Sequence, residues 1–578
     1  MSSSSNSLST TAVLLNGQQT ARERGAELAR LRLFALLLVP AVLSVLPIII
    51  WGLPNGPDFA SHLRFAQAFD ESLRQGNIYP AWQHLSNAGY GDGSFRIYPP
   101  LIYFTLSGIR LFAVDWMFSF QLLVVLMSAA GSFLSFYWLR GFASQTQALL
   151  GASLFCFAPF RINELYQSAM LSQFAAAAFL LLLLGVVERL ADERLPLATV
   201  RRLRVLFAVG SACLILTHVP VAMMAALTIP LYAALRFERK IRLHRLLTLG
   251  MASAIGLCLS AFYWLNLVLE LPLVKGATIQ PGRRFDYRAN FAFSSATQDQ
   301  NGWYVNLLCL ATMALIVPAV MYVSVSFRSR EHKRWMTTSI VLALATLLMT
   351  TGLSAPLWKV IPKLSAIEFP WRWLSASSIF VAGLAGVSLP LLWQSSRSAR
   401  SRPLLLLAAG GVVIALTFSC AYPIRNALFV NRDAFTALLQ NSRTSTSLEE
   451  WLPRSTTLDA ANRLGQQDAS LVNVAGRTAL VQSWGAETRR FTVGAGEAAA
   501  AQIHTFFYPY WQLRTADGKA LPTHPDADGV LLADIPVGPQ TIQMQFIRPA
   551  HQTVANILSL AGVAILAASF GVRRKPKR

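Results

Sequence analysis

Long apolar stretches separated by short basic clusters constrain this chain more than any other feature of its sequence. Runs of roughly 20 apolar residues recur along its length, and an α-helix of that size crosses a hydrocarbon core of about 30 Å. Only 13% of the residues are charged, about half the share that is usual in soluble domains. We therefore predict a polytopic α-helical membrane protein with about 12 transmembrane helices, near residues 33–51, 117–139, 147–159, 170–188, 205–218, 220–236, 247–269, 303–327, 336–352, 373–394, 403–421 and 553–571.

The basic clusters between these runs predict the orientation of the chain. With twelve spans, the clusters fall on the same side as the N-terminus, at residues 188–204, 236–245, 328–334, 395–402 and 573–578. Positively charged loops stay on the cytoplasmic side of a membrane, so we expect both termini in the cytoplasm. The net charge of +22 then follows from the topology. It indicates no nucleic-acid partner, because the basic residues form no single patch.

The predicted spans divide the chain into four parts. Residues 1–31 form a Ser/Thr-rich and then basic cytoplasmic N-terminus that we expect to be disordered. Residues 32–421 form the transmembrane domain, and its first outer loop covers 52–116. Residues 422–552 form an extracytoplasmic β-rich domain, and residues 553–578 hold the last transmembrane helix and a basic cytoplasmic tail.

The β-rich domain is predicted from alternating apolar and polar residues between turn signals. We expect a helix over 426–440 and then a small β-sandwich, with an Asp-Gly hairpin turn at 515–520. The predicted strands cover residues 478–484, 489–493, 502–513, 529–535 and 541–547.

One apolar segment, residues 98–112, is too short to count as a span. It opens with two prolines after Tyr98 and contains Arg110. Counting it as a span would place the basic loops on the wrong side, so we interpret it as interfacial or re-entrant. The five cysteines show no CxxC spacing and are interpreted as packed thiols.

The start of the first outer loop predicts an amphipathic helix on the membrane surface. Apolar residues recur at positions 59, 63, 66, 69 and 73, which is the period of one helix face. Asp58 and His62 are four residues apart and share the other face. Two roles are open for Asp58: a general base, with His62 tuning it or binding phosphate, or a solvated carboxylate that caps the helix.

Glycine and aromatic residues alternate through the rest of this loop without a helical or strand period. Trp82, Tyr90, Phe95 and Tyr98 are too apolar to remain in solvent, so we expect a structured segment. Their rings either stack on sugars or pack on the lipid interface, where Trp and Tyr are favoured. Arg96 lies among them and is a candidate clamp for an anion.

Several short motifs follow one another in an order that resembles a known family. In chain order they are Asp58 with His62, YPAW at 79–82, N-x-G-x-G at 87–91, F-x-x-YPPL at 95–101, APFRINELYQSAM at 158–170, ILTHVP at 215–220, IEFPWRWL at 367–374 and FYPYWQLRTADGK at 507–519. This order resembles the bacterial multispanning membrane family labelled 6-pyruvoyl-tetrahydropterin synthase-related, although Tyr510 replaces a usual glycine. That family in turn resembles the GT-C glycosyltransferases, which use polyprenyl-phosphate-linked sugars.

The resemblance implies a GT-C-like transmembrane domain in the bacterial inner (cytoplasmic) membrane, with two catalytic carboxylates. GT-C proteins carry an acidic base in the first outer loop, and often a second acidic residue in the second outer loop. Asp58 matches the first position, and Glu164 is the only carboxylate within residues 160–170. An ion pair with Arg161 is the alternative explanation for Glu164.

Sugar transfer from a lipid phosphate needs a base for the acceptor hydroxyl and cations for the leaving phosphate. His218 has an alternative role as a helix cap, and Arg372 could instead snorkel to a lipid headgroup or pair with Glu368. The residues that we predict to bind substrate or phosphate are His62, Arg96, Tyr98, Arg161, His218, Arg284 and Arg372.

These expectations converge on an integral-membrane glycosyltransferase of GT-C type. It would transfer a sugar from a polyprenyl-phosphate donor to an envelope glycan, lipid or protein at the extracytoplasmic face, with membrane lipids and the lipid-linked sugar as its partners. The involvement of a divalent metal stays open. The alternative is a non-enzymatic glycolipid or polysaccharide transporter or an assembly scaffold. A transporter would show charged or broken helices at mid-membrane, whereas the candidate residues gather at the outer edge, which favours the enzyme.

Overall fold

A helix lies at every predicted span in the computed structural model of the chain. The structure describes residues 5–112, 115–277, 285–294, 302–325, 330–395, 402–441, 448–467 and 469–571. The helices of the bundle are α1 (Ser5–Trp51), α4 (Trp116–Leu139), α5 (Gln145–Cys156), α6 (Pro159–Tyr166), α7 (Leu171–Leu190), α8 (Leu197–Thr217), α9 (Val219–Arg236), α10 (Arg239–Leu259), α11 (Ala261–Glu270), α12 (Gly302–Ala314), α13 (Val317–Val325), α14 (Arg330–Leu348), α16 (Leu374–Ser395), α17 (Arg402–Arg425) and α20 (Ala550–Gly571).

The polytopic helical architecture is confirmed. Within the described residues, nine helical segments are long and apolar enough to cross a membrane, and the count is ten when the bent pair α10–α11 is taken as one span. α8 also lies at a predicted span, but its first turns carry Arg201, Arg202 and Arg204, and the apolar part of α14 is shorter.

Two boundaries differ from the sequence prediction. The N-terminal residues that we expected to be disordered belong to α1 from Ser5 onward, because extending a helix from an existing turn is easier than nucleating one. α5 and α6 together form one crossing, Gln145–Tyr166, with Pro159 at the favourable first position of α6. The second outer loop is therefore the short stretch before α7, and residues 160–166 belong to the bundle.

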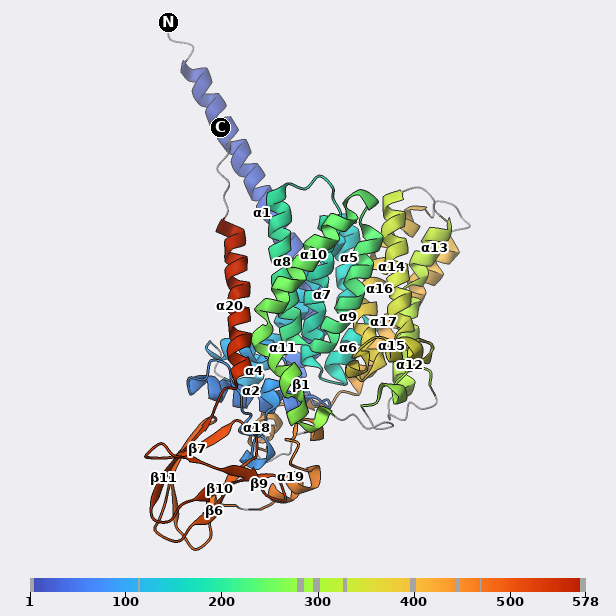
Figure 1. Cartoon of the computed structure of the whole chain (residues 1–578). Helices are drawn as coiled ribbons and strands as arrows, with labels where there is room; N and C mark the ends of the chain where they lie inside the picture. Colours follow the sequence, from blue (N-terminus) through green and yellow to red (C-terminus); the bar gives the residue numbers. More distant parts are fainter. Residues whose placement is uncertain are drawn as a thin grey trace.

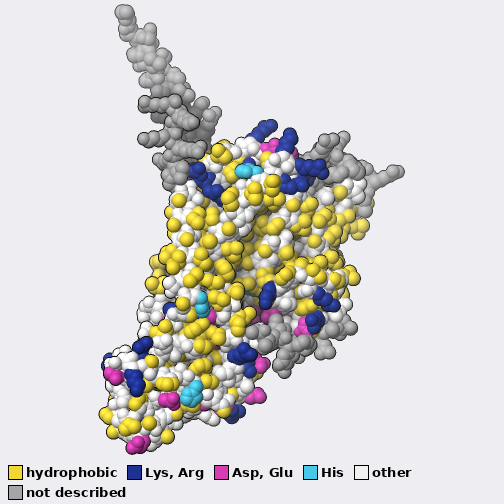
Figure 2. Space-filling model, in the orientation of Figure 1, with side chains coloured by type: hydrophobic (Ala, Val, Ile, Leu, Met, Phe, Trp, Pro, Cys, Tyr) yellow, Lys and Arg dark blue, Asp and Glu magenta, His cyan; other side chains and the backbone are white. Residues whose placement is uncertain are grey.

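The chain places its ends and its β-rich domain at opposite ends of the bundle. α1 extends beyond one end, α20 runs along the bundle toward that same end, and the strands gather beyond the other end (Figure 1). Hydrophobic side chains cover the face of the bundle seen in Figure 2, and Lys and Arg side chains gather at the end opposite the strands. This distribution is typical of a protein whose apolar belt faces lipid and whose ends face water.

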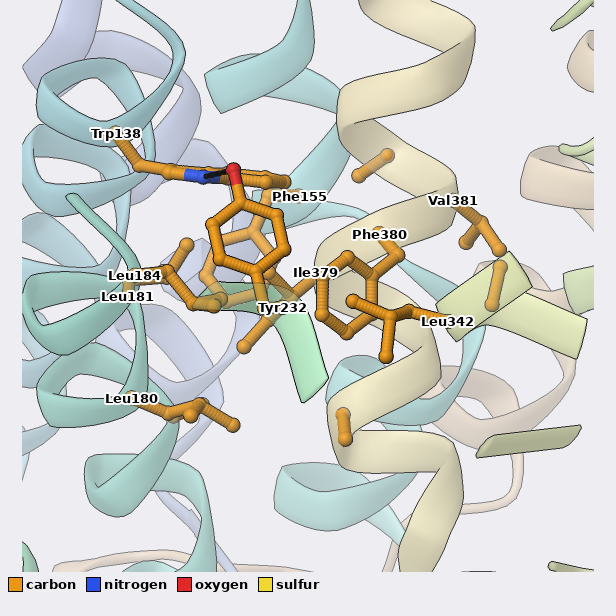
Figure 3. Close-up of a cluster of buried hydrophobic side chains, with 14 of the residues drawn as sticks. Trp138, Phe155, Leu180, Leu181, Leu184, Tyr232, Leu342, Ile379, Phe380 and Val381 are labelled. Carbon is orange, nitrogen blue, oxygen red and sulfur yellow. Dashed lines mark hydrogen bonds between the residues drawn. The ribbon is translucent and has the colours of Figure 1, made fainter. Parts of the chain in front are cut away.

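A large apolar core holds the bundle together. Trp138, Tyr232 and Phe380 meet at its centre (Figure 3). The indole of Trp138 donates to the Tyr232 hydroxyl at 3.0 Å, and that hydroxyl donates to Glu188 at 2.6 Å. Glu188 also pairs with Arg236, so this buried carboxylate is balanced within the bundle.

The first outer loop folds into α2 (Phe59–Arg74) and α3 (Leu101–Arg110), with two short turns between them. α2 carries the predicted apolar residues, but it does not lie open on a membrane surface, because residues on all its faces are buried. It is covered by the bundle and by α18 (Arg432–Asn441). α3 has 10 residues and spans only about 15 Å, so the segment 98–112 does not cross the membrane in the described structure.

Two antiparallel sheets near the C-terminus form the predicted β-sandwich. One has the order β3-β6-β10-β9 and the other β4-β5-β11-β7-β8, and their inner faces share one apolar core. The strands are β3 (Val472–Val474), β4 (Ala479–Trp484), β5 (Thr488–Val493), β6 (Ala499–Phe506), β7 (Trp511–Thr515), β8 (Ala520–Leu521), β9 (Thr523–Pro525), β10 (Val530–Ile535) and β11 (Gln540–Phe546).

Two details of this domain differ from the prediction. The single strand predicted over 502–513 is wrong, because the chain leaves one sheet after β6 and enters the other at β7. The helix predicted over 426–440 starts later, at Arg432. The residues before it form β2 (Phe429–Val430), which pairs with β1 (Leu53–Pro54) directly after the first span.

Candidate functional site

Asp58 lies where the first outer loop touches the turn between α6 and α7. Its backbone N–H donates to the carbonyl of Ser168 at 3.3 Å. Two residues earlier, Gly56 packs so closely that an added Cβ would lie 2.7 Å from the Ser168 carbonyl carbon. Only glycine allows this approach, so the first and second outer loops meet beside Asp58.

The carboxylate of Asp58 does not cap α2. Asp58 occupies the N-cap position, yet its side chain makes no capping hydrogen bond, and the residue is half-buried. Its charge instead acts on Tyr98, Tyr103 and Glu368. The carboxylate therefore belongs to a polar cluster formed by four separate parts of the chain.

His62 is a neutral member of this cluster. It is only 2% exposed, and its Nδ1 lies 3.0 Å from the Tyr103 hydroxyl. Burial lowers the pKa of His62 to about 4, so at neutral pH the imidazole acts through hydrogen bonds and carries no charge for a phosphate. Tyr98 lies edge-on to His62, with ring centroids 6.1 Å apart, and donates to the Ser172 hydroxyl at 3.2 Å.

His218 is also neutral and caps a helix. Its Nδ1 accepts the backbone N–H of Val221 at 3.3 Å at the start of α9, which confirms the helix-cap alternative. Burial lowers the pKa of His218 well below its usual value, and the charges of Arg372 and His62 act in the same direction. These effects place His218 in the same cluster as His62 and Arg372.

Glu368 and Arg372 complete the cluster from the segment that precedes α16. Glu368 has φ 64° and ψ −47°, and the Phe369 N–H donates across it to the Ile367 carbonyl at 2.7 Å. This is a γ-turn with positive φ, a conformation that costs about 1–3 kcal/mol for a residue with a Cβ. Arg372 Nη1 donates to the Ile367 carbonyl at 2.9 Å and to Glu368 at 3.5 Å, so the predicted pairing with Glu368 is present.

Hereafter the Asp58 cluster means seven residues: Asp58, His62, Tyr98, Tyr103, His218, Glu368 and Arg372. Burial raises the pKa of Glu368, and the Asp58 charge adds to that rise. Burial also raises the pKa of Tyr98 to about 12, so its hydroxyl remains a hydrogen-bond donor. Arg372 is the charged cation of the cluster, and its Nε is buried without a hydrogen-bond partner among the described residues.

Glu164 lies deeper, inside the bundle. It is fully buried and accepts hydrogen bonds from Gln173 at 3.0 Å and from Ser375 at 2.7 Å. Arg161 does not pair with it directly. It donates to a backbone carbonyl on α7 and lies between two phenyl rings, Phe155 and Phe174, at 4.3 and 3.8 Å. Both residues therefore lie inside the bundle, within the crossing formed by α5 and α6, and not in the Asp58 cluster.

Arg96 is not brought to the Asp58 cluster. It is fully buried and forms a two-point ion pair with Glu270 on α11, including a 2.9 Å bond from Nε. Its Nη1 donates to Gln552 on α20 at 2.7 Å. The predicted anion clamp is thus already occupied by a carboxylate of the chain. Arg284 lies outside the described residues.

Two of the four aromatic residues singled out in the first loop, Trp82 and Tyr90, pack on the β-sandwich, whereas Phe95 packs against α2. Trp82 is fully buried and contacts Trp511 with ring centroids 5.6 Å apart. Tyr90 stacks on His504 at 3.8 Å. For these buried rings both predicted roles, sugar stacking and lipid packing, are wrong, because the sandwich covers them. Tyr98 is the aromatic residue of this set that reaches the Asp58 cluster.

The side chains present do not form a ready-made metal site. Among the described residues, no group of three or more His, Cys, Asp or Glu side chains is arranged to hold a metal ion. In the Asp58 cluster, Glu368 is paired with Arg372, and Nδ1 of His218 is used by a helix cap. This donor set does not fit a preformed divalent-metal centre.

Sequence reasoning missed Tyr103 and left Glu368 as a mere partner of Arg372. Tyr103 lies in the same apolar segment as Tyr98, residues 98–112, but no local pattern places it beside His62, which is 41 positions away. Glu368 carries no sequence signal for its γ-turn, because positive φ is unusual at a glutamate. Its proximity to Asp58 depends on how α16 packs in the bundle.

Comparisons with known proteins agree with this architecture. A family described as "6-pyruvoyl-tetrahydropterin synthase related domain; membrane protein" matches residues 95–424, more than half of the chain. An uncharacterized protein of Lactococcus lactis subsp. cremoris is 25% identical over 281 residues. That match covers 47% of this chain and 44% of the relative, so the chain spans less than half of that protein.

Solved structures resemble the chain in fold. The apo oligosaccharyltransferase of Archaeoglobus fulgidus has a TM-score of 0.50 at 12% identity, over 70% of this chain and 57% of that one. A mutant of the arabinofuranosyltransferase AftD from Mycobacteria has a TM-score of 0.46 at 14% identity, over 89% of this chain and 42% of that one. At such identities the likeness concerns the fold alone, and the fold is of the GT-C kind.

The matched family and the GT-C-like bundle confirm the resemblance that the motifs indicated. The chain belongs to the family of 6-pyruvoyl-tetrahydropterin synthase-related membrane proteins.

Proposed function

We propose that this protein is a membrane glycosyltransferase of GT-C type. It transfers a sugar from a polyprenyl-phosphate donor to an envelope glycan, lipid or protein at the extracytoplasmic face of the bacterial inner membrane. The observation that carries the proposal is the Asp58 cluster: a half-buried carboxylate that leaves its helix uncapped, in one cluster with a charged arginine whose Nε has no hydrogen-bond partner among the described residues.

The reaction assigns a task to each of the two charged groups. Asp58 takes the proton of the acceptor hydroxyl as its oxygen attacks the anomeric carbon of the donor sugar. The bond from that carbon to the phosphate oxygen breaks, and the phosphate leaves with the bonding electron pair. Arg372 stabilises the negative charge on the leaving lipid phosphate.

The neutral groups of the cluster orient the substrates. His62 and His218 have lowered pKa values and act as hydrogen-bonding groups. The Tyr98 hydroxyl donates to Ser172 and offers its oxygen as an acceptor. Glu368 competes with the donor phosphate for Arg372, because the two side chains are in contact at 3.5 Å. A phosphate that binds Arg372 releases Glu368 from this contact.

The role of Glu164 as a second catalytic carboxylate stays a prediction. Its burial and its bonds to Gln173 and Ser375 support a narrower role, in which it fixes the start of α7. Ser172, next to Gln173, holds the Tyr98 hydroxyl at 3.2 Å. Glu164 would then position Tyr98 without touching the substrate.

The test is complementation of a deletion strain with wild type, Asp58→Asn or Asp115→Asn, followed by quantification of envelope glycans and protein level. Asp115 is a matched control, because it caps α4 through a 2.8 Å bond from the Phe118 N–H and asparagine caps a helix equally well. Asp58→Asn should lower glycan modification by roughly two to four orders of magnitude at an unchanged protein level, and Asp115→Asn should be silent. Full complementation by Asp58→Asn would leave a transporter or scaffold as the better account.

A further inference from the structure

The C-terminal part of the chain meets the first outer loop at a buried polar junction around Arg96. Glu270 of α11 accepts hydrogen bonds from Arg96 at 2.9 Å and from the Tyr508 hydroxyl at 3.3 Å. Its other oxygen lies 2.7 Å from Nε2 of His551 on α20. We call Arg96, Glu270, Tyr508, His551 and Gln552 the Arg96 junction. It joins the first loop, the bent span, the β-sandwich and the last helix.

The junction holds the short segment that carries Tyr98. Tyr263 of α11 donates to the Ile97 carbonyl at 2.8 Å, next to the Arg96 ion pair. On the other side, Gly93 lies against Tyr508 so closely that an added Cβ would come within 2.9 Å of its ring. Residues 93–97 are thus fixed on two sides, and Tyr98 follows directly.

The last helix holds α10 and α11 in their bent arrangement. The two helices meet at an angle of 73°, which removes backbone hydrogen bonds at the break. Ser559 of α20 bridges the break: its hydroxyl accepts the Phe262 N–H at 2.9 Å and donates to the Cys258 carbonyl at 3.1 Å, the two groups that would bond each other in an unbroken helix. Gly562 allows the close contact, because an added Cβ would lie 2.9 Å from the Leu259 nitrogen.

One residue of α20 reaches both α11 and the first loop. The side-chain oxygen of Gln552 accepts Arg96 Nη1 and the Asn266 amide, each at 2.7 Å. Since α20 follows the sandwich directly after β11, this contact joins the last helix to α11 and the first loop beside the packing of Trp82 and Tyr90 on the sandwich. A change in α20 therefore acts on the segment before Tyr98.

We propose that Glu270 and Gln552 are positioning residues for the Asp58 cluster. Both bind Arg96, and Arg96 in turn fixes the segment 93–98 and with it the position of the Tyr98 hydroxyl. The proposal deepens the proposed function and rests on it for the consequence in sugar transfer. It assigns the last helix a task beyond anchoring: α20 holds the bent span and the first loop in the arrangement that the site needs.

The first experiment compares two double variants of the full-length protein in lipid nanodiscs. Arg96→Met with Glu270→Met removes the junction's ion pair without leaving one charge alone. Glu188→Met with Arg236→Met is the matched control, because that pair is also buried and tyrosine-bonded but lies at the opposite end of the bundle. Hydrogen exchange of peptides covering 93–98 and glycan complementation are measured for both.

The junction variant should raise exchange at 93–98 about tenfold and lower glycan modification, while exchange in the β-sandwich strands stays as in wild type. The control should leave 93–98 unchanged. Equal exchange at 93–98 in the two double variants would overturn the proposal, and so would full glycan complementation by the junction variant.

A second pair of variants applies if the junction double variant fails to fold. Gln552→Glu keeps an oxygen for Arg96 and Asn266, whereas Gln552→Leu removes it. Exchange at 93–98 should rise several-fold only in the leucine variant, and the same exchange in both variants would contradict the positioning role. Full complementation by Asp58→Asn, together with a rise in hydrogen exchange at 93–98 only in Gln552→Leu, would contradict the proposed function and still support the structural role of the Arg96 junction.

Discussion

The Asp58 cluster and the Arg96 junction are two polar groupings at the same end of the molecule, and they differ in how completely their groups are bonded. In the junction, the three guanidinium nitrogens of Arg96 are all bonded, two to Glu270 and one to Gln552. In the cluster, Arg372 keeps a buried Nε without a hydrogen-bond partner among the described residues, and Glu368 is held in a strained γ-turn.

This difference separates a structural polar network from a candidate site. Buried polar groups are normally satisfied, so a satisfied ion pair such as Arg96–Glu270 is explained by folding alone. Strained backbone and unsatisfied donors persist only when the surrounding structure enforces them, and they concentrate at functional sites. The comparison therefore supports the proposal that Asp58 and Arg372 carry the chemistry, and that Arg96 has an architectural role.

The largest predicted effect concerns the stability of the junction. Glu270→Met leaves Arg96 buried without its counter-ion, and removal of one partner of a buried pair costs about 3–5 kcal/mol. Glu368→Gln, at the half-buried pair of the Asp58 cluster, should change the free energy of unfolding by less than about 1 kcal/mol. Thermal unfolding of both variants in detergent measures the contrast, and equal losses would remove the distinction between the two regions.

The next effect is a pH dependence that comes from the cluster. Burial lowers the pKa of His62 from its usual 6.5 to about 4. As the pH falls from 6.5 to 4, His62 becomes protonated in the unfolded chain but stays neutral in the folded chain. The free energy of unfolding therefore falls by about 3 kcal/mol because of this residue. His62→Asn should flatten the loss of stability over this pH range.

The control for this pH effect is His524→Asn, which alters an exposed histidine on β9. It should reproduce the wild-type dependence of the melting temperature on pH. A His62→Asn variant that loses as much stability as wild type between pH 6.5 and pH 4 would show that His62 is accessible to protons in the folded protein.

The smallest predicted effect is on phosphate binding by Arg372. Lysine keeps the charge but loses the planar guanidinium that binds phosphate through two donors and stacks on Phe369 at 4.8 Å. Arg372→Lys should weaken the binding of polyprenyl phosphate in nanodiscs about tenfold, or roughly 1.4 kcal/mol. Arg96→Lys keeps a cation for Glu270 and should weaken that affinity less than Arg372→Lys does. A loss of affinity with Arg96→Lys alone would reverse the roles of the two arginines.

The sequence predicted the features that depend on local patterns. The helix at each predicted span follows from apolar length, and strands such as β5 and β10 follow from alternation. Asp58 at the end of the first span also follows from local spacing. The order of the short motifs was sufficient to indicate the family.

The sequence could not show which distant partner each charged residue meets. Arg96 and Glu270 are 174 positions apart, and only the packing of α11 against the first loop brings them together. The neutral state of His62 depends on its burial against Tyr98 and Tyr103, and the break between β6 and β7 depends on a change of sheet. These features arise from tertiary packing, which local residue patterns do not encode.

The most direct test of the central claim separates donor binding from sugar transfer at Asp58. Membrane vesicles from the deletion strain carry wild type, Asp58→Asn or Asp115→Asn and receive metabolically labelled polyprenyl-phosphate sugars extracted from the parent strain. Asp58→Asn should retain most of the bound label, because Arg372 remains, and its rate of transfer should fall by roughly two to four orders of magnitude. Transfer at the wild-type rate by Asp58→Asn would contradict the account.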